Sequence, residues 1–286
     1  MAESPAHKFG QIIGNVLQEA IEPLLQDFAL RHGLYLDKKG TRTVRGGKKK
    51  VSWTDKFGNE HDLDFVLERG GSDARIGEPI AFIETAWRIY TKHARNKTQE
   101  IQGAVLPLVE TYQNTAPFRG VVLAGSFTGG SLDQMKSQGF TVLDFPRDSV
   151  FKAFQRAGID AAYDENTPDT KVLKKIRAWE SLPKTKRTLV KDEMIRINSA
   201  QKERFMMALE RTISRRIVLV RVLPLHGRPV EWKSTKEAIA FVERYDEENV
   251  TDSFARYEVE IRYNNGDRIQ GHFADRHSAI EFLRRY

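Results

Sequence analysis

The chain has 286 residues and no cysteine, and its 46 Lys and Arg exceed its 39 Asp and Glu to give a formal net charge of +7. The lack of cysteine excludes disulfides, thiolate nucleophiles, zinc ribbons and iron–sulfur ligation, and the positive charge favours a polyanionic partner over a neutral metabolite. The absence of a signal-like N-terminus and of a long apolar run predicts an intracellular, cytoplasmic protein that does not enter a membrane.

The first predicted element is a long amphipathic helix over residues 9–31, in which Pro23 is expected to cause a kink or a break. A polar, glycine-containing basic loop follows over residues 37–50. Its cations suit contact with phosphate groups, although a solvated loop would have the same composition. The candidate phosphate-contacting residues are Arg42, Arg45, Lys48, Lys49 and Lys50, with Arg95 further along the chain.

Carboxylates mark the next two strands. A hairpin is predicted to pair residues 51–53 with 61–67, which carry Asp62 and Asp64, and a third strand over 79–88 carries Glu84. A buried carboxylate without a partner costs several kcal/mol, so Glu84 should meet either a bound metal or a Lys or Arg side chain. If these strands pair, an aspartate and Glu84 converge, and such hard oxygen ligands suit Mg²⁺, with Mn²⁺ as an alternative.

The remaining elements predict an α/β fold of the α+β kind, with a mixed sheet flanked by helices over residues 1–163. Residues 164–215 read as a charged helical connector, whose cations either follow a DNA backbone or form a solvated face. Residues 216–286 contain a tandem ββα repeat, because two nine-residue helical segments near its middle and end are identical at five positions. Target recognition, dimerisation and partner docking remain open as roles for this module.

The first half of the chain resembles the PD-(D/E)XK nuclease superfamily, in particular type II restriction endonucleases, in its element order and in the placement of Asp64 and Glu84. The resemblance covers residues 9–150. It implies Mg²⁺-dependent hydrolysis of phosphodiester bonds in double-stranded DNA, with Asp64 and Glu84 as metal ligands. It further implies a metal contact from the Thr85 backbone carbonyl and a site role for Glu19 on the opening helix, with Asp62 as an alternative ligand.

One position departs from this family. Ala86 stands where the family places a lysine, two residues after the glutamate. Some members supply the lysine from the following helix, where helical spacing puts Lys97 on the face turned toward the sheet. Lys97 is therefore the first candidate for this role and Lys92 the second, the alternative being a lysine that extends to water.

A second hypothesis is a non-catalytic DNA-binding protein with a degenerate nuclease fold, which would explain both the positive charge and Ala86. The glycine-containing segments 46–50 and 125–131 lack the residues of a nucleotide phosphate loop, so no nucleotide cofactor is expected. Among enzymes, a restriction endonuclease is favoured over a repair or mobile-element nuclease, because no ATP motif accompanies the compact core. Cleavage of both DNA strands would suit a homodimer.

Overall fold

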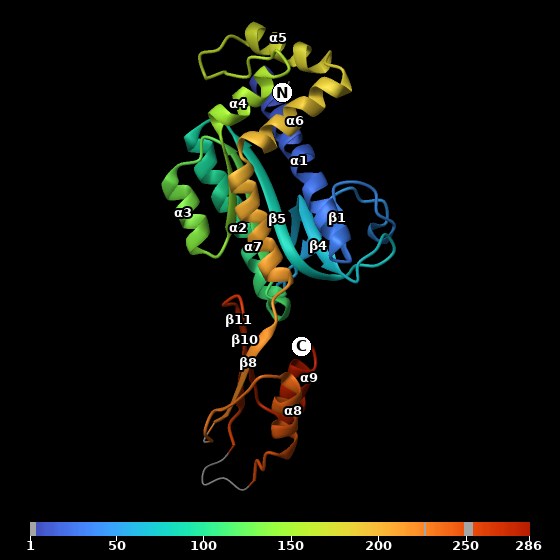
Figure 1. Cartoon of the computed structure of the whole chain (residues 1–286), viewed down its shortest axis with the longest axis vertical. Helices are drawn as coiled ribbons and strands as arrows, with labels where there is room; N and C mark the ends of the chain where they lie inside the picture. Colours follow the sequence, from blue (N-terminus) through green and yellow to red (C-terminus); the bar gives the residue numbers. More distant parts are fainter. Residues whose placement is uncertain (1–3, 226, 249–253) are drawn as a thin grey trace. The chain divides into compact units, whose positions relative to one another are not determined.

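A computed structural model of the chain describes residues 4–225, 227–248 and 254–286. It divides into two compact units, unit 1 (Met1–Leu209) and unit 2 (Glu210–Tyr286). Both units combine helices with β-sheet (Figure 1), which confirms the predicted mixed α/β class. In the described part of the chain, no helix is long and apolar enough to cross a membrane.

Unit 1 is built around a five-stranded sheet in the order β1-β4-β5-β6-β7. The bounds of these strands are β1 Leu34–Lys38, β4 Phe65–Arg69, β5 Glu78–Arg88, β6 Phe118–Gly125 and β7 Thr141–Pro146. The β1–β4 and β4–β5 pairs are antiparallel, whereas β5–β6 and β6–β7 are parallel. Strand β5 is central and buried along nearly its whole length, because helices cover both faces of the sheet there.

Helices on opposite faces of the sheet enclose β5. Helix α1 (Pro5–Arg31) lies against the face that bears Trp87, where its Gly10 lies beside the Trp87 ring. Helix α2 (Thr91–Thr111) packs on the other face, with Phe82 and Ala86. Helix α1 continues through Pro23, so of the expected kink or break, the break does not occur: the buried apolar stripe continues on both sides of the proline and holds the helix against the sheet.

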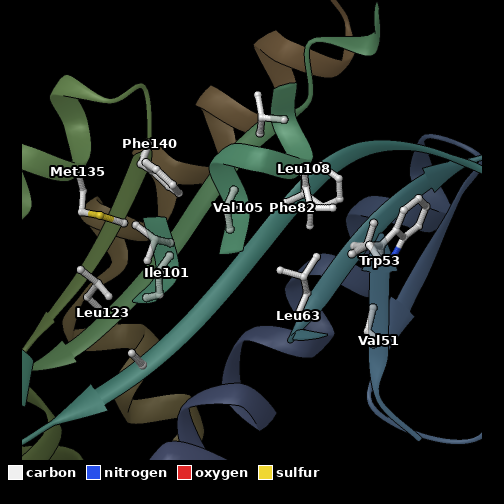
Figure 2. Close-up of a cluster of buried hydrophobic side chains, with 14 residues drawn as sticks. Val51, Trp53, Leu63, Phe82, Ile101, Val105, Leu108, Leu123, Met135 and Phe140 are labelled. Atoms are coloured by element: carbon white, nitrogen blue, oxygen red, sulfur yellow. The ribbon is translucent and has the colours of Figure 1, made fainter. Parts of the chain in front are cut away.

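A separate hairpin lies beside this sheet. It consists of β2 (Val51–Thr54) and β3 (Glu60–Leu63), and its inner side chains Val51, Trp53 and Leu63 join the hydrophobic cluster beneath α2 (Figure 2). The strand predicted over 61–67 is therefore two strands: β3 pairs with β2, and β4 pairs with β1 and β5. The chain bends between them at Asp64.

The predicted connector belongs mostly to unit 1. Its helices are α5 (Asp169–Glu180), α6 (Lys184–Ile197) and α7 (Ser199–Ile213), and they follow α3 (Gly129–Ser137) and α4 (Arg147–Gln155). Helices α5 and α6 pack on α1, and α6 also packs on α4. Trp179 of α5 contacts Phe154 with ring centroids 5.2 Å apart, and Phe205 of α7 contacts Phe118 at 5.4 Å. These buried apolar side chains dock a segment whose charged composition had predicted a helical connector.

Unit 2 contains the predicted repeat. Its elements are β8 Ile217–Pro224, β9 Val230–Trp232, α8 Thr235–Arg244, β10 Tyr257–Tyr263, β11 Arg268–Phe273 and α9 Arg276–Leu283. The two ββα copies form one four-stranded sheet in the order β11-β10-β8-β9. Equivalent ring contacts recur in the copies: Trp232–Phe241 and Phe273–Phe282 both have centroids 4.9 Å apart. The repeat therefore reproduces its packing as well as its sequence.

A buried ion cluster attaches the basic loop to the sheet. The Arg42 side chain is 1% exposed, and its Nη1 lies 2.9 Å from Asp37 Oδ2 and 2.6 Å from Glu68 Oε1. Its Nη2 donates to Glu68 Oε2 at 2.9 Å and to the carbonyl oxygens of Ser72 and Arg75. Arg45 donates to Asp37 and is 9% exposed. Arg42 and Arg45 are therefore structural, and their prediction as phosphate contacts is wrong because buried carboxylates and carbonyl groups occupy them.

Replacing Arg42 with alanine should lower the free energy of unfolding by about 3–5 kcal/mol, because the buried Glu68 carboxylate loses its cation and the buried Asp37 carboxylate keeps only Arg45. Lys49→Ala in the same loop should leave stability within about 0.5 kcal/mol of wild type, since Lys49 is exposed. Urea unfolding followed by circular dichroism measures both changes. Equal, small effects of the two substitutions would contradict the structural role of Arg42.

Candidate functional site

Asp64 meets Glu84 where the chain leaves the five-stranded sheet. Phe65 of β4 lies opposite Ile83 of β5, so continued pairing would place Asp64 opposite Glu84. The chain instead bends at Asp64 toward the β2–β3 hairpin. The Asp64 amide donates to Glu84 Oε1 at 3.0 Å, and this contact joins the bend to the middle of the sheet.

Three donors hold the Asp64 carboxylate. The Thr85 amide and the Thr85 hydroxyl donate to Oδ2 at 2.8 Å and 2.7 Å. The Gln18 side-chain amide donates to Oδ1 at 2.7 Å. Segments from α1, the β3–β4 junction and β5 therefore converge on one carboxylate, whose orientation is fixed by partners on two sides.

Glu84 is the most perturbed acid of this group. Its side chain is 7% exposed. Burial and the nearby charge of Asp64 raise its pKa to about 8 from 4.5, against the opposing influence of Lys97. In the part of the chain that the structure describes, Glu84 has no ion pair, so of the two expected partners, a bound metal or a Lys or Arg side chain, the second is absent there. A buried carboxylate in this state favours a cation as an additional partner.

The acidic residue predicted on the opening helix does not join the site. Glu19 is 58% exposed and pairs with Lys191 of α6 at 3.2 Å. Its neighbour Gln18 takes the place beside Asp64 instead. Helical spacing does not distinguish the two: Gln18 precedes the buried Ile21 by three residues and Glu19 follows the buried Val16 by three, so each borders one flank of the buried stripe.

Asp62 and Thr85 contribute differently from the prediction. Lys50 pairs with Asp62, and the Ser52 hydroxyl donates to it at 2.6 Å, so the Asp62 carboxylate belongs to the outer side of the hairpin. Its charge nevertheless helps to raise the pKa of Glu84. Thr85 enters the cluster as a hydrogen-bond donor through its amide and hydroxyl, and its carbonyl as a metal ligand stays a prediction.

The two candidate lysines differ in their relation to Glu84. The charge of Lys97 acts on Glu84 and lowers its pKa, and the Lys97 side chain is only 24% exposed. Its Nζ lies 3.1 Å from Glu100, one turn further along α2. Lys92 is exposed at the start of α2. Ala86 packs in the hydrophobic cluster, so the position of the family lysine is part of the core.

The remaining predicted phosphate contacts are exposed. Lys48, Lys49 and Arg95 face solvent, and so does Lys50 beside Asp62. Lys48 is 4.0 Å from Glu60. These four cations are available to an anionic partner, and their contact with one stays a prediction.

The residues of this site could bind a divalent cation through a small number of protein ligands. Within the described residues, no group of three or more His, Cys, Asp or Glu side chains is arranged to hold a metal ion. The protein ligands would be the oxygens of Asp64 and Glu84, with water and a substrate phosphate in the other positions, which is the pattern typical of Mg²⁺. The buried Glu84 carboxylate, without an ion-pair partner, is the observation that supports this fit.

The raised pKa of Glu84 should make the stability of the protein depend on pH. With EDTA present, the unfolding free energy of wild type should fall as pH rises from 4.5 through about 8. Over this range the Glu84 carboxyl ionises readily in the unfolded chain, whereas in the native protein burial keeps it protonated until about pH 8. The maximum slope is about 1.4 kcal/mol per pH unit. Glu84→Gln should remove this component, so the variant gains on wild type as pH rises. Urea unfolding at pH 5.5, 7 and 8.5 measures the difference.

Glu60→Gln provides the matched control for that experiment, because Glu60 is 64% exposed on the neighbouring hairpin. It should follow the wild-type pH profile. Parallel profiles for wild type and Glu84→Gln would contradict the raised pKa of Glu84.

Comparisons with known proteins provide no family assignment. No family model matches the chain, and no curated protein matches it significantly. A crystal structure of a protein of unknown function, AF1548, matches 67% of this chain and 99% of that chain, with 11% sequence identity and a TM-score of 0.29. A function for this chain therefore has to be inferred from the site itself.

Proposed function

We propose that the chain is a Mg²⁺-dependent endonuclease that hydrolyses phosphodiester bonds of double-stranded DNA. The observation that carries the proposal is the Asp64–Glu84 pair, in which one carboxylate is fixed by three donors and the other is buried without an ion-pair partner. The net charge of +7 supports a polyanionic substrate. The expected resemblance to PD-(D/E)XK nucleases supports the same reaction class.

Each residue of the site has a distinct role in this proposal. When bound, Mg²⁺ would neutralise charge on the scissile phosphate and lower the pKa of an attacking water molecule. Asp64 and Glu84 supply the negative charge that selects a cation, and Thr85 and Gln18 keep the Asp64 carboxylate in place. Lys97 favours the ionised form of Glu84 and adds positive charge next to the substrate phosphate.

Within this class, we infer a type II restriction endonuclease. Unit 1 is a compact core, and unit 2 is a small second module that could read the target or form dimer contacts. Cleavage of both strands of a duplex would then be shared between two copies of the chain. A cytoplasmic location and Mn²⁺ as an alternative metal belong to the same proposal.

A second candidate function is non-catalytic binding to DNA. It is favoured by the buried Ala86 at the position of the family lysine and by a pair of carboxylates where a nuclease often has three acids. A protein of this kind would bind duplex DNA with an affinity that depends on salt but not on Mg²⁺. Metal dependence of both binding and cleavage therefore separates the two candidates.

Cleavage of unmethylated, phage-sized duplex DNA tests the site assignment. Wild type with Mg²⁺ should give discrete fragments on a gel and none with EDTA. Glu84→Gln and Asp64→Asn should lower the cleavage rate on the order of 100-fold or more, because each removes a metal ligand, while DNA binding in EDTA persists. Glu19→Gln is the matched control and should retain wild-type cleavage, since Glu19 pairs with Lys191 away from Asp64.

The possible outcomes of this cleavage test separate the alternatives. A smear in place of discrete fragments would indicate a nonspecific nuclease. Full activity in both Glu84→Gln and Asp64→Asn would remove the nuclease proposal for this site. Cleavage by none of the proteins, on methylated as well as unmethylated DNA, would favour the binding-only function.

Lys97→Met tests the lysine assignment. Loss of the Lys97 charge should raise the pKa of Glu84 further, because that charge now lowers it. The expected result is a cleavage rate about 10–100-fold lower and a pH profile displaced toward higher pH. Lys92→Met should match wild type, since Lys92 is exposed at the start of the helix. The reverse pattern would transfer the role to Lys92.

A further inference from the structure

We propose that the helical hairpin α5–α6 is the surface on which the phosphate backbone of duplex DNA docks. This inference rests on the proposed function for the identity of the partner. It adds the location of the main contact surface: of the two interpretations of the connector over residues 164–215, it selects contact with a DNA backbone, and it names the cations that make the contact.

The hairpin is one of two strongly basic segments of the chain. Residues 170–189 contain seven Lys and Arg and one Glu, a net charge of +6, and the basic loop over residues 37–50 contains seven Lys and Arg and one Asp, which is also +6. In the loop, however, five of the seven cations have an acidic partner, namely Lys38, Arg42, Arg45, Lys48 and Lys50. A polyanion approaching the protein would therefore meet more unpaired cations on the hairpin than on the loop.

The cations of the hairpin form one exposed surface. On α5, Lys171, Lys174 and Arg177 are exposed at a spacing of three residues, while the opposite side buries an apolar stripe that ends at Trp179. On α6, a similar exposed pair lies in the first turn. The exposed cations of the two helices are Lys171, Lys174, Arg177, Lys184 and Lys186. In the described part of the chain, no acidic side chain forms an ion pair with any of these five residues.

Neighbouring cations in the same hairpin do have partners and fix its shape. Lys175 pairs with Asp160 at 3.0 Å, and Arg187 donates to the carbonyl of Glu180 at 2.7 Å while lying 5.5 Å from the Trp179 ring. Glu180 itself pairs with Lys8 of α1 at 2.6 Å. Buried apolar side chains dock the hairpin and the Lys8–Glu180 pair connects it to α1, while the unpaired cations are exposed to solvent.

Stability does not explain the unpaired cations. Like charges one turn apart on a helix destabilise it by about 0.2–0.5 kcal/mol per pair. The two acids of α5 stand at its ends: Asp169 forms no ion pair with these cations among the described residues, and Glu180 pairs with Lys8 of α1. Phosphates of a duplex would neutralise this charge, and release of their counterions would drive binding. The arrangement is therefore favourable with DNA bound and mildly unfavourable without it.

Helices α5 and α6 lie beside α1 (Figure 1), the helix that also contributes Gln18 to the candidate site. Lys191 of α6 pairs with Glu19, the residue that follows Gln18 in α1, and Gln18 contacts Asp64. Glu180 pairs with Lys8, and the stretch of α1 from Lys8 to Gln18 is about 15 Å long. That length is about half a helical turn of DNA, so one duplex could contact both the hairpin and the site.

Salt-dependent DNA binding tests the proposal. The triple variant K171Q/K174Q/R177Q is compared with wild type by fluorescence anisotropy on a labelled 25-base-pair duplex, in EDTA, between 50 and 200 mM salt. The slope of log K against log salt should be smaller in magnitude by about 3, one for each lost phosphate contact, and the affinity at 100 mM salt should fall at least tenfold. Because EDTA prevents Mg²⁺-dependent cleavage, this result is independent of whether the chain is a nuclease.

The matched control is K233Q/K236Q/R285Q in unit 2, which makes the same change in net charge at exposed positions. It should keep the wild-type slope. An equal loss of affinity in both triple variants would mean that net charge alone attracts DNA, and would overturn the proposal. Wild type that binds vesicles containing phosphatidylserine but not the duplex would overturn it as well. Urea unfolding of both variants verifies that they remain folded.

Discussion

The hydrogen bond from the Asp64 amide to Glu84 is the contact on which the candidate site depends. It exists because the chain bends at Asp64 and transfers from the sheet pairing of β4 to the hairpin pairing of β3. A continuous strand would have used that amide for regular pairing. The bend leaves the edge of β5 open, and there the Asp64 carboxylate accepts from Thr85 in place of a neighbouring strand. The geometry of the site thus follows from an interruption of the sheet.

Two buried charged residues, Arg42 and Glu84, have different surroundings. Arg42 is surrounded by Asp37, Glu68 and two carbonyl oxygens, so its burial is compensated within the protein. Glu84 is buried near another carboxylate, with Lys97 as the cation that acts on it and no ion pair among the described residues. The first arrangement stabilises a fold, whereas the second favours an external cation. This contrast within one protein is the main support for a site at Glu84.

Sequence patterns predicted much of the fold because they report local preferences. Apolar spacing indicated α1, α2 and the buried strand β5, and the repeated segments indicated the two ββα copies of unit 2. Pairing of the two predicted strands also indicated that Asp64 and Glu84 lie close together, although Asp64 itself occupies the bend next to the last pair, Phe65 and Ile83. The errors have a common origin: Pro23 continues a helix, and the charged helices α5–α7 are docked, because buried tertiary contacts outweigh local composition.

The sequence by itself determined the mixed α/β class, the ββα repeat, the positive charge and the two carboxylates in neighbouring strands, since each depends on residue type and spacing along the chain. Only the tertiary structure decided that Gln18 and not Glu19 faces Asp64, that Arg42 is internal, and which cations of α5 and α6 remain without partners. Those outcomes depend on which segments meet in space. The identity of a basic residue does not indicate whether a buried carboxylate or solvent surrounds it in the folded chain.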